Sequence, residues 1–393
     1  MWTRRQMIQS GLGSVGLALL GSRSAFASAP TENRLVLIVL RGGLDGLDAL
    51  PPFEDRSYKH LRPTLALHPG GDLEGVQSLD GYFGMHPGLA PLQPLYQAGE
   101  LLFVPAISTR YRTRSHFDGQ NLLENGSGTP FGARTGWLNR AILGLNDQDA
   151  RLGLSIGPAV PLILHGDASV QTWTHSNLSP VDEEFLARLM NAYQDDAHFL
   201  DSLHDAQGAL KPELDMTAFE GQPRRRTEFT LAAHAAADLL SQTKGPRIAV
   251  MEMTGWDTHF AQQRRLMPLL GMLSSGLLEL KSGLGTHWDK TTVVVVSEFG
   301  RTAGENGSRG TDHGTGGLSL IAGGAVRGGQ IAGTWPGLSN KALLDERDVR
   351  PANSYEALFK TLLIGHLGLD PGFVEDKVFP NSRAFAPMDG LLG

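Results

Sequence analysis

Short apolar runs recur along the chain, and a glycine-rich or polar loop follows each of them. A continuous apolar run of about four to eight residues is typical of a strand that is buried on both faces, as in a parallel sheet. The pattern predicts strands at residues 35–40, 101–107, 160–164, 247–253, 292–297 and 318–322, and the run at 160–164 is the weakest of them.

Segments with helical spacing of apolar residues separate the predicted strands, for example at 89–97, 266–281 and 355–367. Strands that alternate with helices are typical of α/β domains. We therefore expect an α/β fold, with a doubly wound, mostly parallel sheet and helices on both faces. Residues 181–243 are more polar and helix-forming, so we expect a helical insertion or cap there, within one domain at 28–393.

The first 27 residues have the three parts of a secretory signal. Arg4 and Arg5 are the consecutive arginines of a twin-arginine signal, a weakly apolar stretch covers 8–21, and Ala25-Phe26-Ala27 is a small-x-small cleavage site. The apolar stretch is shorter than the roughly 20 residues that span a bilayer, which disfavours the alternative of a membrane anchor. We expect cleavage after Ala27, transport by the twin-arginine export machinery, no stable membrane insertion, and a periplasmic or secreted protein.

Charge and cysteine content limit the partners and the ligands. Cleavage removes three arginines and no acid, so the formal net charge goes from −7 to −10, which argues against nucleic acid as a partner. The chain has no cysteine, which excludes disulfides, a thiolate nucleophile and thiolate-bound metals. A metal site would have to use His, Asp, Glu or hydroxyl ligands.

Chemically suggestive residues follow the predicted strands. In open α/β sheets, ligands bind beyond the carboxyl ends of the strands, so these residues are the first candidates for a site. They are Asp45, Ser115, His116, Asp257, His259, Glu298, Arg301, Asp312 and His313. Acid, imidazole and hydroxyl groups at so many successive strand ends predict one shared site.

Two of the candidates allow two interpretations each. Ser115 stands where a helix begins, so its hydroxyl could be an N-cap, paired with Asp118, or a nucleophile at a helix N-terminus that favours anionic groups, and the two interpretations are compatible. Arg301 either neutralises Glu298, which leaves a buried strand, or holds a substrate oxyanion in a forked contact.

The remaining pairs are patterns of metal ligands. Asp257 and His259 are two residues apart in a loop, so they either bind one metal together or form a structural ion pair. His313 stands between Asp312 and a glycine, which suits a metal ligand supported by a neighbouring carboxylate.

Five motifs and the export signal resemble a large bacterial family. The motifs are Arg41-Gly42-Gly43-Leu44-Asp45-Gly46, Ser115-His116-Phe117, Gly255-Trp256-Asp257-Thr258-His259, Ser297-Glu298-Phe299-Gly300-Arg301-Thr302 and Thr311-Asp312-His313-Gly314. On these motifs the chain is identified as a member of the family catalogued as domain of unknown function 1501, over nearly the whole mature chain. That family resembles a branch of the alkaline phosphatase superfamily, which includes sulfatases and cofactor-independent phosphoglycerate mutases.

The resemblance implies two metal ions and a hydroxyl nucleophile acting on phosphate or sulfate esters. By motif order, Ser115 resembles the nucleophile, and Asp257, His259 and His313 resemble the ligands of the first metal. Asp45 resembles a ligand of the second metal.

Glu298 resembles the acid of the superfamily's strand-end Asp-His pair, and Phe299 replaces the imidazole of that pair. A second alignment makes Asp312 and His313 that pair. His116 and Arg301 would stabilise the transferring anion. No Cys or Ser stands in the sulfatase context, so formylglycine chemistry is not expected.

We therefore expect an exported metal-dependent hydrolase of phosphate, sulfate or related esters, acting on a small-molecule or polymer ester. One or two divalent ions are expected, with Zn²⁺ first and Mn²⁺ or Ca²⁺ as alternatives. The alternative function is a non-catalytic, phosphatase-like scaffold that serves as a periplasmic binding or assembly protein.

Overall fold

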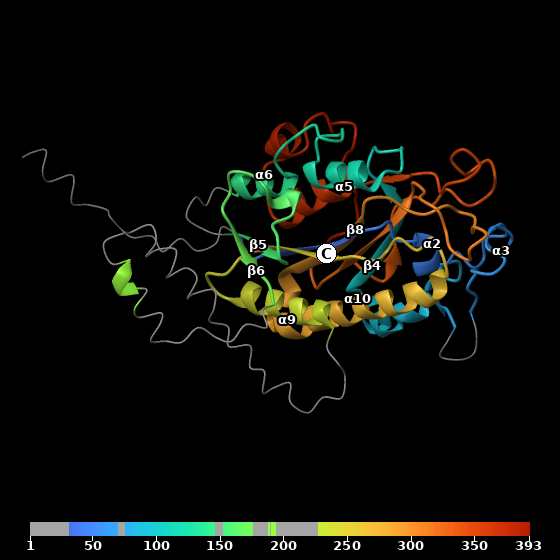
Figure 1. Cartoon of the computed structure of the whole chain (residues 1–393), viewed down its shortest axis with the longest axis horizontal. Coiled ribbons are helices and arrows are strands. Elements are labelled where there is room, and N and C mark those ends of the chain that lie inside the picture. The colour runs from blue at the N-terminus through green and yellow to red at the C-terminus, as the bar shows by residue number, and fades with distance from the viewer. Residues whose placement is uncertain (1–30, 70–74, 146–151, 176–187, 189, 194–226) are drawn as a thin grey trace, which may run out of the picture.

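The computed structural model describes residues 31–69, 75–145, 152–175, 188, 190–193 and 227–393. A central sheet lies between two layers of helices (Figure 1). The described strands of this sheet are β1 (Arg34–Leu40), β4 (Leu101–Ser108), β5 (Gly153–Ile156), β6 (Val170–Trp173), β7 (Ile248–Met253), β8 (Thr291–Ser297), β9 (Gly317–Ala322), β10 (Gln330–Ile331) and β11 (Asn353–Ser354). Their order is β10-β4-β9-β8-β1-β7-β5-β6, with β11 beside β4.

The sheet is mostly parallel, as predicted. β1 lies between β7 and β8 and runs parallel to both, whereas β9 runs antiparallel to β4 and β8. A small separate sheet pairs β2 (Gln77–Ser78) with β3 (Gly84–Met85). The α/β fold class expected from the sequence is confirmed.

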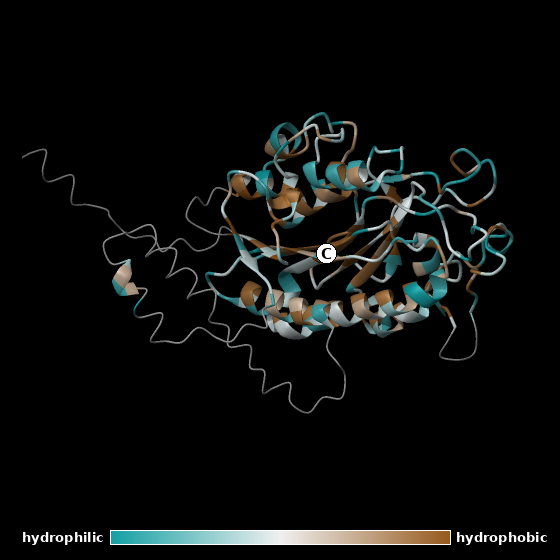
Figure 2. Ribbon diagram, in the orientation of Figure 1, coloured by the Kyte–Doolittle hydropathy of each residue, from teal (hydrophilic) through white to brown (hydrophobic). Residues whose placement is uncertain are grey.

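Alternate residues of β1 belong to two different hydrophobic cores, which explains its continuous apolar run. On one face, the core includes residues of η1 (Pro87–Leu92), α4 (Gln93–Gln97), α9 (Glu228–Ser241) and α10 (Gln262–Leu284). On the other face, the core includes residues of α5 (His116–Asn125), α6 (Trp137–Gly144) and α11 (Tyr355–Lys360). Figure 2 shows apolar residues on the sheet and on the helix faces turned toward it.

Two local expectations differ from the structure. Residues 160–164 do not form a strand: they include the short 3₁₀ helix η2 (Leu162–Leu164), and the neighbouring strands are β5 and β6. Proline at 161 and the brevity of β5 and β6 explain the error, because a four-residue strand leaves little periodic signal. The helix predicted at 355–367 begins as α11 and continues as a π-helical turn at Thr361–His366.

The signal at 1–27 and most of the insertion predicted at 181–243 lie outside the described residues. The last part of 181–243 contains α9, which packs against α10 and β7. In the described part of the chain, no helix is long and apolar enough to cross a membrane.

The topology brings several loops to one edge of the sheet. Leu40, at the end of β1, is in register with Met253 at the end of β7 and Ser297 at the end of β8. Because β9 is antiparallel, its first residue, Gly317, pairs with Ile107 near the end of β4. The loops after β1, β4, β7 and β8 and the loop before β9 therefore leave the sheet at the same edge.

Candidate metal centre

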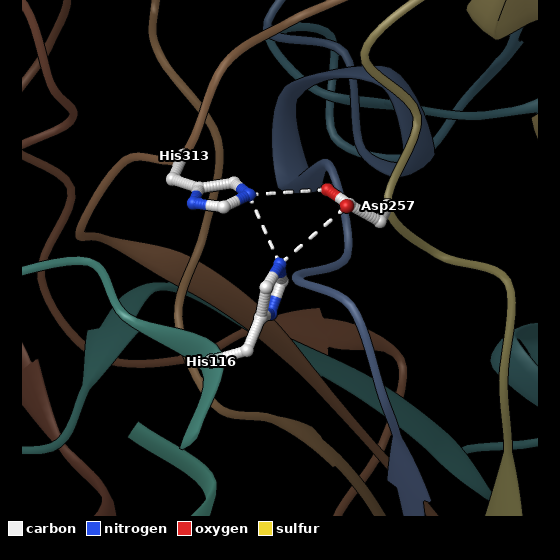
Figure 3. A group of neighbouring side chains, drawn as sticks. All are labelled: His116, Asp257 and His313. Atoms are coloured by element: carbon white, nitrogen blue, oxygen red, sulfur yellow. Dashed lines mark hydrogen bonds and ion pairs between the residues drawn. The ribbon is translucent and has the colours of Figure 1, made fainter. Parts of the chain in front are cut away.

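Three side chains from three of these loops converge at the sheet edge (Figure 3). His116 begins α5, Asp257 follows β7, and His313 precedes β9. One potential ligand atom of each lies within 4.8 Å of the other two. The Nε2 atoms of His116 and His313 are 3.0 Å apart, and Asp257 Oδ1 is 3.2 Å from Nε2 of His313.

His259 adjoins this group. Its Nε2 lies 3.0 Å from Nε2 of His313 and 3.1 Å from Oδ1 of Asp257. The structure thus brings together Asp257, His259 and His313, and adds His116. We call these four residues the centre.

Each imidazole of the centre has an oxygen acceptor at its other nitrogen. Nδ1 of His116 lies 2.7 Å from Oε1 of Glu298, and Nδ1 of His259 lies 3.2 Å from Oδ1 of Asp312. Nδ1 of His313 lies 3.0 Å from the backbone carbonyl oxygen of Arg114. An oxygen acceptor at Nδ1 supports the tautomer with the proton there, and in that tautomer the Nε2 lone pairs of the neutral rings face into the centre.

This donor set fits a cation. In neutral rings with the proton on Nδ1, the lone pair of His313 Nε2 would face those of His116 and His259 Nε2 at 3.0 Å, and the facing lone pairs would repel one another. A divalent ion between three imidazole nitrogens and a carboxylate would turn that repulsion into ligation, and Zn²⁺ readily accepts such ligands.

Electrostatics favour ionised carboxylates around the centre. Burial raises the pKa of Asp257, but the hydrogen bond and charge of Arg301 outweigh it, and the pKa lies below the usual value. The hydrogen bond to Glu298 raises the pKa of His116, whereas burial, followed by the charge of His116, lowers that of His313.

Glu298 lies behind His116. Its Oε1 accepts hydrogen bonds from the backbone N–H of Gly42 (2.8 Å) and from Nε2 of Gln120 (3.1 Å), besides its contact with Nδ1 of His116. Burial raises the pKa of Glu298, yet the hydrogen bonds from His116 and Gln120 hold it below the usual value. The structure therefore places this predicted metal ligand where it orients an imidazole.

Asp45 is not brought into the centre. Its Oδ1 accepts hydrogen bonds from the backbone N–H groups of Leu47 and Asp48, which caps the short helix α2 (Gly46–Ala49). Its Oδ2 lies 2.9 Å from Nη1 of Arg62 and 2.7 Å from Nε2 of Gln262. This predicted metal ligand is thus in a buried ion pair.

Arg301 contacts Asp257 and not Glu298. Its fully buried guanidinium donates to the Asp257 carboxylate and to the backbone carbonyls of Gly43 (2.8 Å) and Thr311 (3.1 Å). These contacts join the loops after β1 and β7 to the loop before β9. Arg301 therefore fixes the position of Asp257 and does not contact Glu298. Its expected contact with a substrate oxyanion stays a prediction.

Ser115 occupies the N-cap position of α5, but its side chain makes no capping hydrogen bond. Asp118 bonds to the hydroxyl of Tyr111 at 3.0 Å, so it does not complete a capping pair. The preceding Arg114 has a left-handed φ of 67°, and its carbonyl oxygen contacts His313. Ser115 is thus held between two residues that both touch His313, and its hydroxyl is not a helix cap.

Asp312 supports His259. Its Oδ1 contacts Nδ1 of that ring and accepts a hydrogen bond from Asn306 Nδ2 at 3.1 Å. Phe299, which stands where the resemblance implies an imidazole, packs beside the rings of His116 and His313, with centroid distances of 4.9 and 5.2 Å. Both residues hold imidazoles of the centre in place.

Sequence patterns missed Arg62 and Gln262. Gln262 stands four residues before Leu266, which is itself four residues before Leu270, so it is a polar residue in the buried stripe of a helix. A polar side chain in such a stripe needs buried partners, and this was an available signal. Nothing in the sequence pattern distinguishes the buried Arg62 from arginines at the surface.

Comparison with known proteins identifies the family. A model of the family described as "Protein of unknown function (DUF1501)" matches residues 105–373. No curated protein matches the chain in sequence.

Solved structures give remote likenesses. The structure titled "Crystal structure of Ps i-CgsB" is 13% identical, with 89% of this chain and 74% of that chain covered and a TM-score of 0.40. A protein in the alkaline phosphatase superfamily from Vibrio parahaemolyticus is 13% identical, with 78% and 65% covered and a TM-score of 0.38. A mutant of TAB5 alkaline phosphatase with Mg bound is 13% identical, with 75% and 92% covered and a TM-score of 0.36.

At such scores these likenesses do not define the activity of the chain. The family model, in contrast, covers more than half of it, and the chain therefore belongs to the DUF1501 family.

Proposed function

We propose that this protein is an exported metal-dependent hydrolase of phosphate, sulfate or related esters. The observation that carries the proposal is the convergence of His116, Asp257 and His313, with Nε2 of His259 beside Asp257 and His313. Each of the three imidazoles has an oxygen acceptor at Nδ1. In metal sites, an imidazole ligand typically donates the N–H of its other ring nitrogen to an oxygen acceptor, which fixes the orientation of the ring. Zn²⁺ is the ion that we expect first.

His116, Asp257, His259 and His313 would hold the ion. When bound, a divalent ion lowers the pKa of a coordinated water or hydroxyl group and neutralises charge that develops on an ester oxygen. Three acceptors would hold a proton on Nδ1 of each imidazole and so leave Nε2 free to bind the ion. They are Glu298, Asp312 and the carbonyl of Arg114. Arg301 keeps the Asp257 carboxylate ionised and in position.

The Ser115 hydroxyl is the proposed nucleophile. It stands at the N-terminus of the ten-residue helix α5, where free N–H groups and the helix dipole favour an anionic group such as a transferred phosphoryl. The left-handed φ of Arg114 directly before it supports a functional interpretation, because such conformations cluster at active sites.

The decisive experiment measures metal and turnover together. The mature chain, 28–393, is purified without added metal, its metal content is determined by plasma mass spectrometry, and it is then tested with phosphomonoesters, phosphodiesters, phosphonate esters and sulfate esters. We expect a bound divalent ion and hydrolysis of at least one class. Asp257→Asn should lose both, whereas Asp238→Asn, at an exposed position of α9, should lose neither.

The alternative is a non-catalytic scaffold. A folded protein that keeps its metal but hydrolyses no ester of the panel would favour a binding or assembly role. An Asp257→Asn variant that retained both metal and turnover would refute the proposed centre.

A further inference from the structure

The buried guanidinium of Arg62 lies beside Asp45, the residue that resembles a ligand of the second metal ion in the alkaline phosphatase superfamily. The side chain of Arg62 is fully buried, and its Nη1 lies 2.9 Å from Oδ2 of Asp45. Its Nε donates to the carbonyl of Ala303 at 3.0 Å and its Nη2 to that of Thr302 at 2.9 Å. A buried carboxylate requires a compensating charge, and Arg62 provides it.

Gln262 completes the arrangement around Asp45. Its Nε2 donates to Oδ2 of Asp45 at 2.7 Å and to Oδ2 of Asp48 at 3.1 Å. Its Oε1 accepts hydrogen bonds from Oγ1 of Thr258 at 2.9 Å and from Oγ1 of Thr311 at 2.7 Å. All four residues bonded to Gln262 are buried.

The two threonines belong to the loops that carry the centre. Thr258 separates Asp257 from His259, and Thr311 comes two residues before His313. Through one amide oxygen, Gln262 therefore fixes the loop after β7 to the loop before β9.

Glu298 is the other carboxylate that the resemblance assigns to a second ion, and it too has hydrogen-bond donors from the protein around its oxygens. His116, Gly42 and Gln120 surround its Oε1, and Oγ of Ser297 lies 3.2 Å from its Oε2. A further divalent ion would have to displace these donors from Glu298 and Arg62 from Asp45.

We infer that a buried cluster of Asp45, Asp48, Arg62 and Gln262 takes the place of a second metal ion, so that the protein binds one ion, at His116, Asp257, His259 and His313. The inference rests on the proposed function, because it concerns the same centre. A second ion would contribute positive charge and a link between loops. In the buried cluster, Arg62 provides the positive charge and Gln262 provides the link.

Native mass spectrometry of the mature chain tests the number of ions. The protein is stripped with a chelator, loaded with Zn²⁺ and desalted in the presence of a weak competing chelator. One retained Zn²⁺ per chain supports the inference. Two retained ions would overturn the inference and leave the proposed function intact, whereas none would overturn both.

Glu298→Gln distinguishes a residue behind the centre from a ligand. The amide oxygen can still accept the Nδ1 proton of His116 but lacks the negative charge, so we expect one retained Zn²⁺ with about 10- to 100-fold weaker affinity. If the wild type retained two Zn²⁺ ions and Glu298→Gln retained one, Glu298 would be a ligand of a second ion. If the variant bound Zn²⁺ as tightly as the wild type, the role of Glu298 in orienting His116 would be contradicted.

Gln262→Ala tests the link between the loops, with Gln263→Ala as the matched control. The control removes the side chain of Gln263, an exposed neighbour on the same helix. Within the described residues, this side chain donates a hydrogen bond of 3.3 Å to the carbonyl of Thr64. We expect Gln262→Ala to weaken Zn²⁺ binding at least about 10-fold and Gln263→Ala to leave it unchanged. Equal Zn²⁺ affinity in all three proteins would contradict the positioning role. If Gln262→Ala does not fold, the ion count of the wild type and of Glu298→Gln still decides.

Discussion

At the scale of single residues, the centre depends on what stands behind each ligand. His116, His259 and His313 are bonded at Nδ1 by a carboxylate, a second carboxylate and a backbone carbonyl, respectively. The sequence predicts that these residues meet at one sheet edge. It does not predict which carboxylate touches an ion and which orients an imidazole, because that depends on the direction in which each side chain leaves its loop.

Ser115→Ala separates catalysis from helix stability. We expect a loss of turnover on the order of 100-fold or more, with metal content retained and thermal stability nearly unchanged, because the Ser115 side chain makes no capping bond. Thr227→Ala is the comparison, since Thr227 does cap α9 and its removal should cost about 1 kcal/mol without affecting turnover. Full turnover in Ser115→Ala would exclude it as the nucleophile.

Asp48 should make stability depend on pH. Burial, followed by the charge of Asp45, raises the pKa of Asp48 to about 7. In the unfolded chain, the carboxyl group of Asp48 loses its proton near pH 4, so between about pH 4 and 7 the folded state binds more protons than the unfolded state. The free energy of unfolding therefore decreases as the pH rises through this range, by up to about 1.4 kcal/mol per pH unit.

Asp48→Asn removes that titration. The amide stays neutral, so the stability of the variant relative to wild type should rise between pH 5 and pH 7.5, as measured by urea unfolding at both values. An equal difference at the two pH values would contradict a raised pKa for Asp48.

At the scale of elements, the loop after β1 is shaped by a close approach of two backbones. Gly42 has a φ of 124°, and a Cβ there would lie 2.6 Å from the backbone nitrogen of Asp257. The Arg41-Gly42-Gly43 motif is thus explained by packing against the loop that carries two ligands of the centre.

Gly42→Ala should therefore weaken both folding and metal binding. The left-handed conformation costs an alanine about 1–2 kcal/mol, and the overlap with Asp257 adds about 1–3 kcal/mol. Gly81→Ala is the control, because Gly81 also has a positive φ, 86°, but an added Cβ there would meet nothing within 4 Å. If both variants unfolded at the same urea concentration and kept the same Zn²⁺ affinity, the close approach would have no energetic role.

The elements also show which parts of the fold a sequence can predict. Long apolar runs such as β1 and β8 were predicted because they are buried on both faces. The antiparallel direction of β9 was not predicted, since an apolar run carries no information about strand direction. The same limit applies to the cluster around Gln262, which is 217 residues from Asp45 along the chain.

At the scale of the whole molecule, we propose that residues 1–27 direct export by the twin-arginine route. This proposal is independent of the metal centre, and these residues lie outside the described part of the chain. Replacing Arg4 and Arg5 by lysine should keep the precursor in the cytoplasm with residues 1–27 attached. Fractionation and intact-mass measurement would check this outcome. A processed double variant in the periplasm would show that the twin-arginine pair is not used, without bearing on the metal centre.

The long sequence separations within the centre have a consequence for the measurement of metal binding. His116 and His313 are 197 residues apart along the chain, and Asp257 and His313 are 56 apart. An unfolded chain does not hold these groups together, so an ion binds the folded state much more tightly and stabilises it by mass action, by up to about 2.7 kcal/mol at a free concentration 100 times Kd. At equal free concentrations, the metal with the higher affinity should therefore raise the melting temperature more, which ranks Zn²⁺, Mn²⁺ and Ca²⁺ without a substrate.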